Sequence, residues 1–292
     1  MDEASGPSRR GPSTRHLHVL DHPARAKPNP TGAGPVGWPP PGVATAPPEA
    51  PVVVLVHGSL DRATSFGRVV RRLPELHVIT YDRRGYGGSR GVVPLAEDLE
   101  LHVQDLLQVV GERRAVVVGH SLGGDVAMAA AIEAPDRIVA VGAYEPPLPW
   151  MAWWPRRSQP SLEGVDPGRY AEQFFRRMVG DSAWDHLNDR ARADRLAEGP
   201  ALVAELRAIR GERPPFDVAA LTVPAVFGRG GQSAERHRAA AAALHAAVPG
   251  SQLLDIAGAS HGAHLTHPDA FADLVRTTVS AAGATPHRAT GS

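Results

Sequence analysis

The stretch AVVVGHSLGG, residues 115–124, decides the fold, and the run VAMAAA follows it at 126–131. The β-branched run predicts a buried strand, and the alanine-rich run predicts a helix. Ser121 lies on the sharp turn between them, where Gly119 and Gly123 let neighbouring backbone segments approach without a Cβ clash. A serine on such a turn is held above the sheet, at a helix N-terminus that favours developing negative charge. The pattern therefore indicates a nucleophile elbow with Ser121 as the nucleophile.

Apolar runs that predict further buried strands lie on both sides of the elbow, at 52–56, 76–81, 138–144, 223–228 and 252–256. Segments with helical spacing or composition separate them, at 66–72, 95–110, 233–248 and 268–280. A short alternating run at 16–20 is a candidate edge strand. Because strand and helix alternate, the fold class is α/β with a doubly wound, mostly parallel sheet.

The alternation fails between residues 146 and 215, where three helical segments are predicted at 167–179, 182–197 and 200–210. This segment is interpreted as a helical lid inserted after the strand that ends near Tyr144. It contains most of the large aromatic side chains. We expect one or more of them either to line an apolar substrate pocket or simply to pack the lid onto the core; the candidates are Trp150, Trp153, Trp154 and Phe174.

The domain organisation follows from these patterns. Residues 1–50 form a flexible N-terminal region with the possible edge strand and a Pro/Gly-rich loop from residue 28 onward, whose role stays open. Residues 51–145 and 216–282 form the α/β core around the lid at 146–215. Residues 283–292 are a tail.

Composition excludes several classes of function. The 292 residues carry 31 basic and 31 acidic side chains, so nothing favours nucleic-acid binding. The absence of cysteine excludes disulfides and thiolate chemistry. No apolar run approaches the roughly 18 residues of a membrane span, and no hydrophobic signal core is present at the N-terminus, so a cytoplasmic protein is expected. The oligomeric state is left open.

Four motifs in a fixed order give the chain a family resemblance. They are His57-Gly58 after the first apolar strand, DRRGYGGS at 82–89, GHSLG at 119–123 and GASHGAHLTHP at 258–268. Over roughly residues 50 to 282 the chain resembles the α/β-hydrolase family. The resemblance implies a serine hydrolase whose nucleophile, acid and histidine follow in that chain order.

A serine hydroxyl needs a base to take its proton as it attacks. The resemblance favours His261, seven residues before Pro268, over its competitors His264 and His267. The oxyanion needs backbone donors already in place. Leu122, directly after the nucleophile, is expected to supply one N–H. Either Ser59 or Leu60 supplies the other, with Leu60 slightly favoured.

The third member of the triad departs from the common pattern of the family. Gly231 stands where many relatives carry an aspartate, and no carboxylate follows until Glu235. The alternative place in the family is the end of the strand after the elbow helix, which here holds Glu145, and we predict that Glu145 orients His261. Its other interpretation is a salt bridge that anchors the lid. Weaker candidates for the acid are Asp125, Asp255, Asp217 and Glu235.

The expected function is cleavage of an ester-like bond in a small, apolar substrate through an acyl-enzyme, with no metal and no organic cofactor. The same residues fit thioester, lactone or carbon–carbon cleavage and acyl transfer. A serine nucleophile argues against epoxide hydrolases and haloalkane dehalogenases, which resemble this fold but attack through an aspartate. A non-catalytic ligand-binding protein is the alternative that Gly231 suggests. An interaction protein that works through the Pro/Gly-rich segment has only composition behind it.

Overall fold

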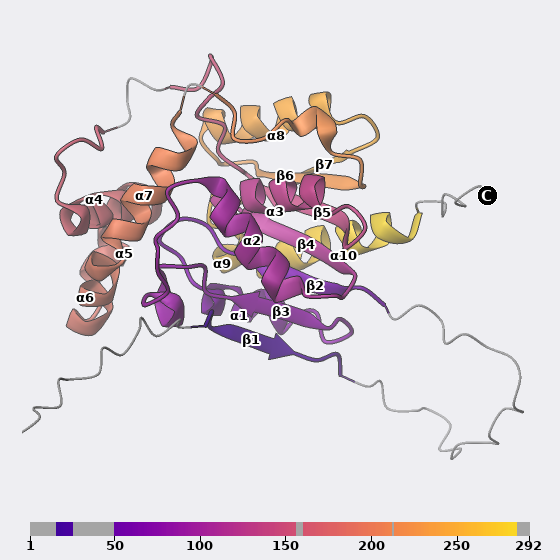
Figure 1. Ribbon diagram of the computed structural model, residues 1–292, viewed down its shortest axis with the longest axis horizontal. Helices are drawn as coiled ribbons and strands as arrows, with labels where there is room; N and C mark the ends of the chain where they lie inside the picture. The colour runs from indigo at the N-terminus through magenta and orange to yellow at the C-terminus, as the bar shows by residue number, and fades with distance from the viewer. Residues whose placement is uncertain (1–15, 26–49, 156–159, 212, 285–292) are drawn as a thin grey trace, which may run out of the picture.

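The computed structural model describes residues 16–25, 50–155, 160–211 and 213–284. The predictions for residues 1–15, for the Pro/Gly-rich segment up to residue 49 and for the tail from residue 285 lie outside these described residues. Within them, one sheet and its covering helices carry the fold (Figure 1).

The sheet has seven strands in the order β1-β3-β2-β4-β5-β6-β7, and only β1 runs antiparallel to its neighbour. The predicted edge strand is therefore present, but it begins at Val19 instead of residue 16. The remaining strands pair in parallel, as their continuous apolar sequences predict for a sheet covered on both faces. The strand bounds are β1 Val19–His22, β2 Val52–Val56, β3 Val78–Tyr81, β4 Ala115–His120, β5 Ile138–Tyr144, β6 Ala225–Gly230 and β7 Gln252–Ile256.

Helices cover both faces of the sheet and give it two separate apolar layers. One layer lies under α1 (Gly67–Val70), α9 (Ala263–Thr266) and α10 (Pro268–Ala284). The other lies under α2 (Leu99–Val110), α3 (Leu122–Glu133) and α8 (Glu235–Ala247). This three-layer arrangement is the doubly wound fold that the alternation of elements predicts.

One helix starts later than its apolar spacing suggests. The spacing predicts a helix from residue 95, but α2 begins at Leu99. The reason is Asp98, whose side chain accepts a hydrogen bond from the Leu101 N–H at 2.9 Å and caps the first turn.

Four helices lie between β5 and β6: α4 (Pro167–Val179), α5 (Asp181–Asp185), α6 (Asp189–Ala197) and α7 (Gly199–Ile209). We call α4 to α7 the helical insertion. They lie beyond the carboxyl ends of the parallel strands, at the left of Figure 1. The single helix predicted over 182–197 is wrong: the chain breaks between α5 and α6, where Asn188 caps α6 by accepting a hydrogen bond from the Ala191 N–H at 2.9 Å.

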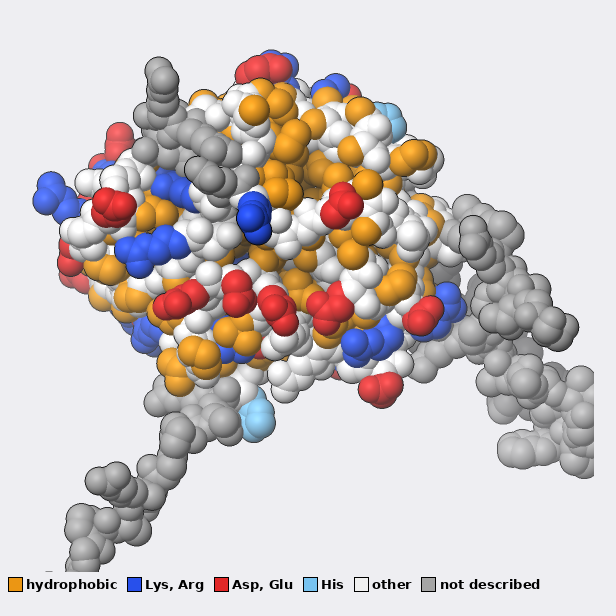
Figure 2. Space-filling view, turned by 45° about the horizontal axis from the view of Figure 1, so that its top comes forward, with side chains coloured by type: hydrophobic (Ala, Val, Ile, Leu, Met, Phe, Trp, Pro, Cys, Tyr) orange, Lys and Arg blue, Asp and Glu red, His pale blue; other side chains and the backbone are white. Residues whose placement is uncertain are grey.

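None of the helices in the described part of the chain is long and apolar enough to cross a membrane. The space-filling view shows a face on which hydrophobic side chains gather in a hollow in the upper part, while acidic side chains lie across the lower part (Figure 2).

Candidate active site

The carboxyl ends of four strands of the sheet bring the candidate residues together. His57 follows β2, Ser121 follows β4, and Glu145 follows β5, whose last residue, Tyr144, is in register with His120 of β4. His261 lies in the loop that follows β7. In open α/β sheets this edge is where ligands bind, because loops from several strands meet there.

Ser121 occupies a strained turn, as the elbow motif predicts. Its backbone has φ 53° and ψ −130°, a left-handed conformation that is rare for a residue with a side chain. The turn is tight enough that a Cβ on Gly119 would lie 2.0 Å from the Gly123 carbonyl oxygen. In the described residues, only Leu60, Ser121 and Glu145 combine a side chain with positive φ. Such strain costs about 1–3 kcal/mol per residue and concentrates at functional sites.

Glu145 and His261 contact each other directly. Glu145 Oε2 lies 2.8 Å from His261 Nδ1, and the Glu145 side chain is fully buried. The other carboxylate oxygen, Oε1, accepts a hydrogen bond from the Gly230 N–H at 2.7 Å. The Tyr144 hydroxyl donates to the Ser260 carbonyl at 2.9 Å and so holds the loop that carries the histidine. The carboxylate is therefore fixed on both oxygens and faces the imidazole.

The geometry also explains why β6 needs no acid of its own. β6 extends to Gly230, two residues further than predicted, and Gly231 after it is exposed. A Cβ on Gly230 would lie 2.4 Å from the Ala259 carbonyl oxygen and 2.6 Å from the Tyr144 hydroxyl. The end of β6 thus contributes a backbone N–H, and the carboxylate comes from the end of β5.

A buried arginine holds the turn that follows β2. Arg83 Nε donates to the His57 carbonyl and Nη2 donates to the Gly58 carbonyl, both at 2.9 Å. Its remaining nitrogen, Nη1, donates to Glu205 Oε2 of α7 at 2.8 Å. His57 accepts the Arg83 backbone N–H at Nε2, and burial followed by the charge of Arg83 lowers the pKa of His57 to about 4. His57 therefore shapes this turn as a neutral side chain.

The two candidates for the second oxyanion donor differ in their surroundings. Ser59 lines both cavities next to Ser121. The Tyr86 hydroxyl donates to Glu205 Oε1 at 2.7 Å, and burial followed by Glu205 raises the pKa of this phenol. The Leu60 carbonyl accepts from Arg195 at 3.0 Å. Leu60 lines only the second cavity, whereas Ser59 lines both, so Ser59 is the better placed of the two candidates.

The competing histidines have other partners. His264 is buried, and its Nε2 lies 3.2 Å from Asp61 Oδ2. Burial opposes the charge of Asp61, but the contact with His264 outweighs it and holds the pKa of Asp61 well below its usual value. His267 Nδ1 lies 2.9 Å from the Thr266 hydroxyl. His120 Nε2–H donates to the His261 carbonyl at 2.7 Å.

In the part of the chain that the structure describes, two groups of three side chains have ligand atoms within 4.8 Å of one another, a spacing that suits a metal ion. One group is Asp61, His120 and His264. The other is Glu145, His237 and His261. Asp61 contacts His264 in the first group, and the second group contains the Glu145–His261 pair.

Two cavities meet at Ser121 and Ser59. The first, of about 290 Å³, is lined by side chains from the loop after β5, from the helical insertion and from α8, with Trp154, Phe174, Met178, Leu206 and Ile209 as apolar walls. The second, of about 390 Å³, lies on the side of His261 and extends along Asp61 and Phe175. A substrate bound across the nucleophile would place one part in each.

Two of the four aromatic candidates line the cavities next to Ser121, and two do not. Trp154 is buried and lines the first cavity, and Phe174 lines both cavities. Trp150 packs against Phe216 with ring centroids 5.7 Å apart, and Trp153 is 43% exposed. Neither of these two tryptophans lines either cavity, which corrects that part of the expectation. The Trp150 ring contacts Phe216 instead, and the Trp153 side chain is exposed to solvent.

The chain is similar to known proteins in both sequence and fold. Residues 53–274 match a family described as the alpha/beta hydrolase family. The chain belongs to this family. The matched segment contains every residue of the elbow, the Glu145–His261 pair and the turn after β2.

Relatives in the family have several activities. The chain is 34% identical over 179 residues to epoxide hydrolase A of Mycobacterium tuberculosis; the match covers 59% of this chain and about half, 52%, of that protein. It is 29% identical over 241 residues to the pimeloyl-[acyl-carrier protein] methyl ester esterase of Pectobacterium atrosepticum, covering 76% of this chain and 92% of that one.

Solved structures share the fold of this hydrolase. An esterase from Thermogutta terrifontis superposes with a TM-score of 0.66 at 21% identity, covering 91% of this chain and 93% of that one. The enol-lactonase from Burkholderia xenovorans superposes with a TM-score of 0.65 at 20% identity, covering 90% and 96%. At these identities the likeness extends to the fold alone.

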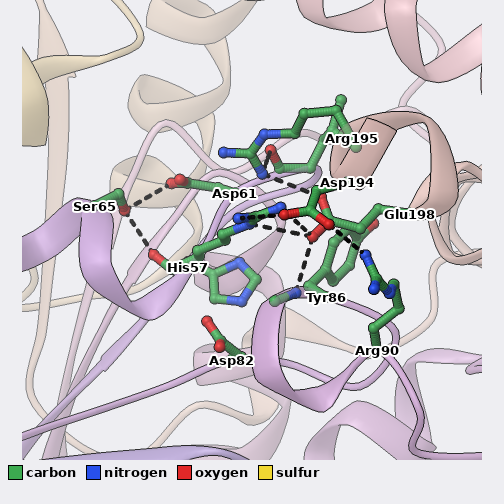
Figure 3. Close-up of polar contacts among 12 residues, drawn as sticks. His57, Asp61, Ser65, Asp82, Tyr86, Arg90, Asp194, Arg195 and Glu198 are labelled. Carbon is green, nitrogen blue, oxygen red and sulfur yellow. Dashed lines mark hydrogen bonds and ion pairs between the residues drawn. The ribbon is translucent and has the colours of Figure 1, made fainter. Parts of the chain in front are cut away.

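An ion-pair cluster attaches the helical insertion of this hydrolase to its core. Glu198 is fully buried; its Oε1 accepts from Arg62 at 2.8 Å and from the Gly87 N–H at 2.9 Å. Its Oε2 accepts from Arg195 at 3.2 Å, and Arg90 pairs with Asp194 at 2.8 Å. Figure 3 shows this cluster beside Tyr86 and Asp61. Through Arg195 the cluster also reaches the Leu60 carbonyl, so the insertion and the turn next to the nucleophile are held together.

Several residues at the site gave no signal in the sequence. The His237 ring stacks on His261 with centroids 4.3 Å apart and lines the first cavity. Arg177 and Arg236 line the same cavity, from α4 and α8. No motif surrounds these residues, and their distance in sequence from Ser121 hides their proximity.

Of the weaker carboxylate candidates, Asp125 is the one that lies under the elbow. It is completely buried in the first turn of α3, and neither carboxylate oxygen has a hydrogen-bond partner in the described residues. Burial raises the pKa of this carboxyl well above its usual value. Asp255 instead pairs with Arg229 at the surface, at 2.7 Å.

Proposed function

We propose that the protein is a serine hydrolase that cleaves an ester-like bond through an acyl-enzyme. The observation that carries this proposal is the 2.8 Å contact between Glu145 Oε2 and His261 Nδ1, at the edge of the sheet where Ser121 stands on its strained turn. A carboxylate at Nδ1 keeps the proton on that nitrogen and leaves Nε2 free to accept one.

In the first step, Ser121 Oγ attacks the carbonyl carbon of the substrate while His261 Nε2 takes the hydroxyl proton. The negative charge moves to the carbonyl oxygen, where the backbone N–H groups of Leu122 and Ser59 stabilise it. The bond to the leaving group then breaks, and the imidazolium gives its proton to the departing oxygen. Glu145 stabilises the positive charge on the ring throughout.

In the second step, water attacks the acyl-enzyme while His261 takes a proton from it. The tetrahedral intermediate collapses, the acid leaves, and the proton returns to Ser121 Oγ. Every step uses residues of this chain. The two cavities that meet at Ser121 would hold the acyl part and the leaving group on opposite sides of the nucleophile. A small molecule of limited size therefore fits the site, and Trp154 and Phe174 provide apolar contact.

The relative named as an epoxide hydrolase does not extend this proposal to epoxides. An aspartate nucleophile is what the sequence analysis associates with that chemistry, and this chain carries Ser121. A ligand-binding protein without catalysis, which Gly231 suggested, is less well supported, because Glu145 occupies the position from which an acid reaches His261.

The test is activity of the purified protein on short p-nitrophenyl esters together with covalent labelling by a fluorophosphonate. We expect hydrolysis and labelling in the wild type, both lost in Ser121→Ala. Ser182→Ala, an exposed serine of α5, is the matched control and should retain both. If the wild type is neither labelled at Ser121 nor faster than Ser121→Ala, the hydrolase proposal is wrong.

A further inference from the structure

Three arginines line the first cavity, and none of them forms an ion pair with a carboxylate of the described residues. Arg210 donates to the Pro160 carbonyl at 3.0 Å and to the Tyr170 hydroxyl at 3.1 Å. Arg177 of α4 and Arg236 of α8 both line the cavity, together with Ser121. We call them the cavity arginines. Within the described residues, no carboxylate lies within the 4.0 Å of an ion pair from either guanidinium.

Their neighbours on the same helices are paired. Arg176, next in the chain to one of the cavity arginines, contacts Glu172 at 2.9 Å and Asp181 at 3.2 Å. Arg238, two residues from the other, pairs with Glu235. Arg177 is exposed at the cavity mouth and Arg236 is half-buried, and within the described residues neither has such a partner.

The two positive charges act on each other across the cavity. Burial lowers the pKa of Arg236, the charge of Arg177 lowers it further, and the charge of Glu145 opposes both. Arg177 is held over the Phe174 ring, with its Cζ 5.4 Å from the ring centroid. Two like charges next to a partly buried cavity destabilise the empty site, and an anion bound between them removes that repulsion.

A buried histidine adds a neutral donor to the same wall. His237 is 5% exposed, and within the described residues neither ring nitrogen has a hydrogen-bond partner. Burial and the neighbouring His261 lower the pKa of His237, so the ring is neutral at neutral pH and carries one N–H. A buried donor without a partner is unfavourable, and a ligand acceptor that pairs with it would remove that cost.

We infer that the first cavity binds an anionic group of the substrate, so that this protein prefers esters whose acyl chain is apolar in the middle and ends in a carboxylate. The cavity arginines would bind the carboxylate, with His237 as a further donor. The apolar walls formed by Met178 and Leu206 would contact the methylene groups. The volume of about 290 Å³ suits the acyl part of a half-ester of a five- or six-carbon diacid, with the leaving group in the second cavity. The inference rests on the proposed hydrolase function of Ser121.

The test compares methyl esters of equal acyl-chain length that end either in a carboxylate or in a methyl group. Monomethyl glutarate is paired with methyl pentanoate, and monomethyl adipate with methyl hexanoate; hydrolysis is followed by titration of the released acid. We expect kcat/KM to be at least tenfold higher for the charged member of each pair. Arg236→Gln and Arg177→Gln should each lower this ratio about tenfold, and 0.5 M salt should lower it in the wild type. Arg238→Gln and Arg176→Gln are the matched controls and should keep the ratio.

A ratio near one in the wild type, or a ratio that Arg236→Gln leaves unchanged, overturns the inference while the hydrolase proposal stands. Arg236→Lys, which keeps the charge, should retain more of the preference than the glutamine variant and separates loss of charge from misfolding. If the wild type hydrolyses none of the esters, calorimetric titration of glutarate into Ser121→Ala decides. Binding that Arg236→Gln abolishes supports the anion site without the hydrolase, and absence of binding overturns it.

Discussion

Replacing Glu145 by glutamine tests the acid of the proposed triad, because the change keeps the shape of the side chain and removes one acceptor. Glu145 now accepts two hydrogen bonds, from the Gly230 N–H at 2.7 Å and from His261 Nδ1 at 2.8 Å. An amide has only one oxygen. The backbone N–H of Gly230 is a fixed donor and must face that oxygen, so the amide NH₂ group turns toward the imidazole.

The imidazole then adopts the other tautomer. Nδ1 accepts from the amide, and the ring proton moves to Nε2, which can no longer take the proton of Ser121. An equivalent loss in serine-protease triads lowers kcat about 10⁴-fold. At 1.36 kcal/mol for each factor of ten, this corresponds to about 5 kcal/mol of transition-state stabilisation. Because Gly230 keeps its hydrogen bond, we expect the fold and the Tm of Glu145→Gln to change little.

The assay measures kcat for a p-nitrophenyl ester in the wild type, in Glu145→Gln and in Asp255→Asn, with circular dichroism to check the fold. Asp255 is the matched control, because it is a carboxylate of β7 that pairs with Arg229 at the surface and should be dispensable. A kcat for Glu145→Gln within tenfold of the wild type, in a folded protein, would refute the role of Glu145 and transfer it to another carboxylate.

Two further predictions concern stability. Burial raises the pKa of Asp125 in the folded protein, so folding takes up a proton, and stability falls as the pH rises above the pKa of the unfolded chain. In urea unfolding, the difference in free energy of unfolding between Asp125→Asn and the wild type should grow in favour of the variant by at least about 1 kcal/mol between about pH 5 and pH 8. An equal dependence on pH in both proteins would contradict this. Glu198→Gln leaves Arg62 and Arg195 without their shared charge. We expect a loss of about 2 kcal/mol in the free energy of unfolding. This is less than the ~3–5 kcal/mol for breaking a fully buried pair, because both arginines retain contact with water. Unchanged urea unfolding would argue against the ion-pair cluster as an anchor of the helical insertion.

Most of the sheet could be predicted because a parallel strand covered on both faces has a local signature. The continuous apolar runs at β2, β4, β5 and β7 match the observed strands within a residue or two. Helix boundaries were less accurate where a single polar side chain ends or starts a helix, as Asp98 and Asn188 do. Such a capping side chain can set the helix boundary within one turn of the position that the apolar spacing indicates, and the spacing alone does not show where the helix begins.

By itself, the sequence determined the family and the elbow, and it singled out Ser121 as the proposed nucleophile. Each depends on neighbours along the chain: a strand, a tight turn and a helix within some twenty residues around Ser121. It also narrowed the acid to a few carboxylates, with Glu145 first. Only the tertiary structure decided which carboxylate faces His261, because the two residues are 116 positions apart and meet through the parallel order of β5, β6 and β7.

The same holds for the first cavity. Its walls come from the loop after β5, from α4 and from α8, which no local pattern joins. The unpaired charges of Arg177 and Arg236 are visible only when the carboxylates around every arginine are known. Local sequence patterns thus pointed to Ser121 as the proposed nucleophile. Contacts between distant segments place the base beside its acid and shape the cavities next to the nucleophile.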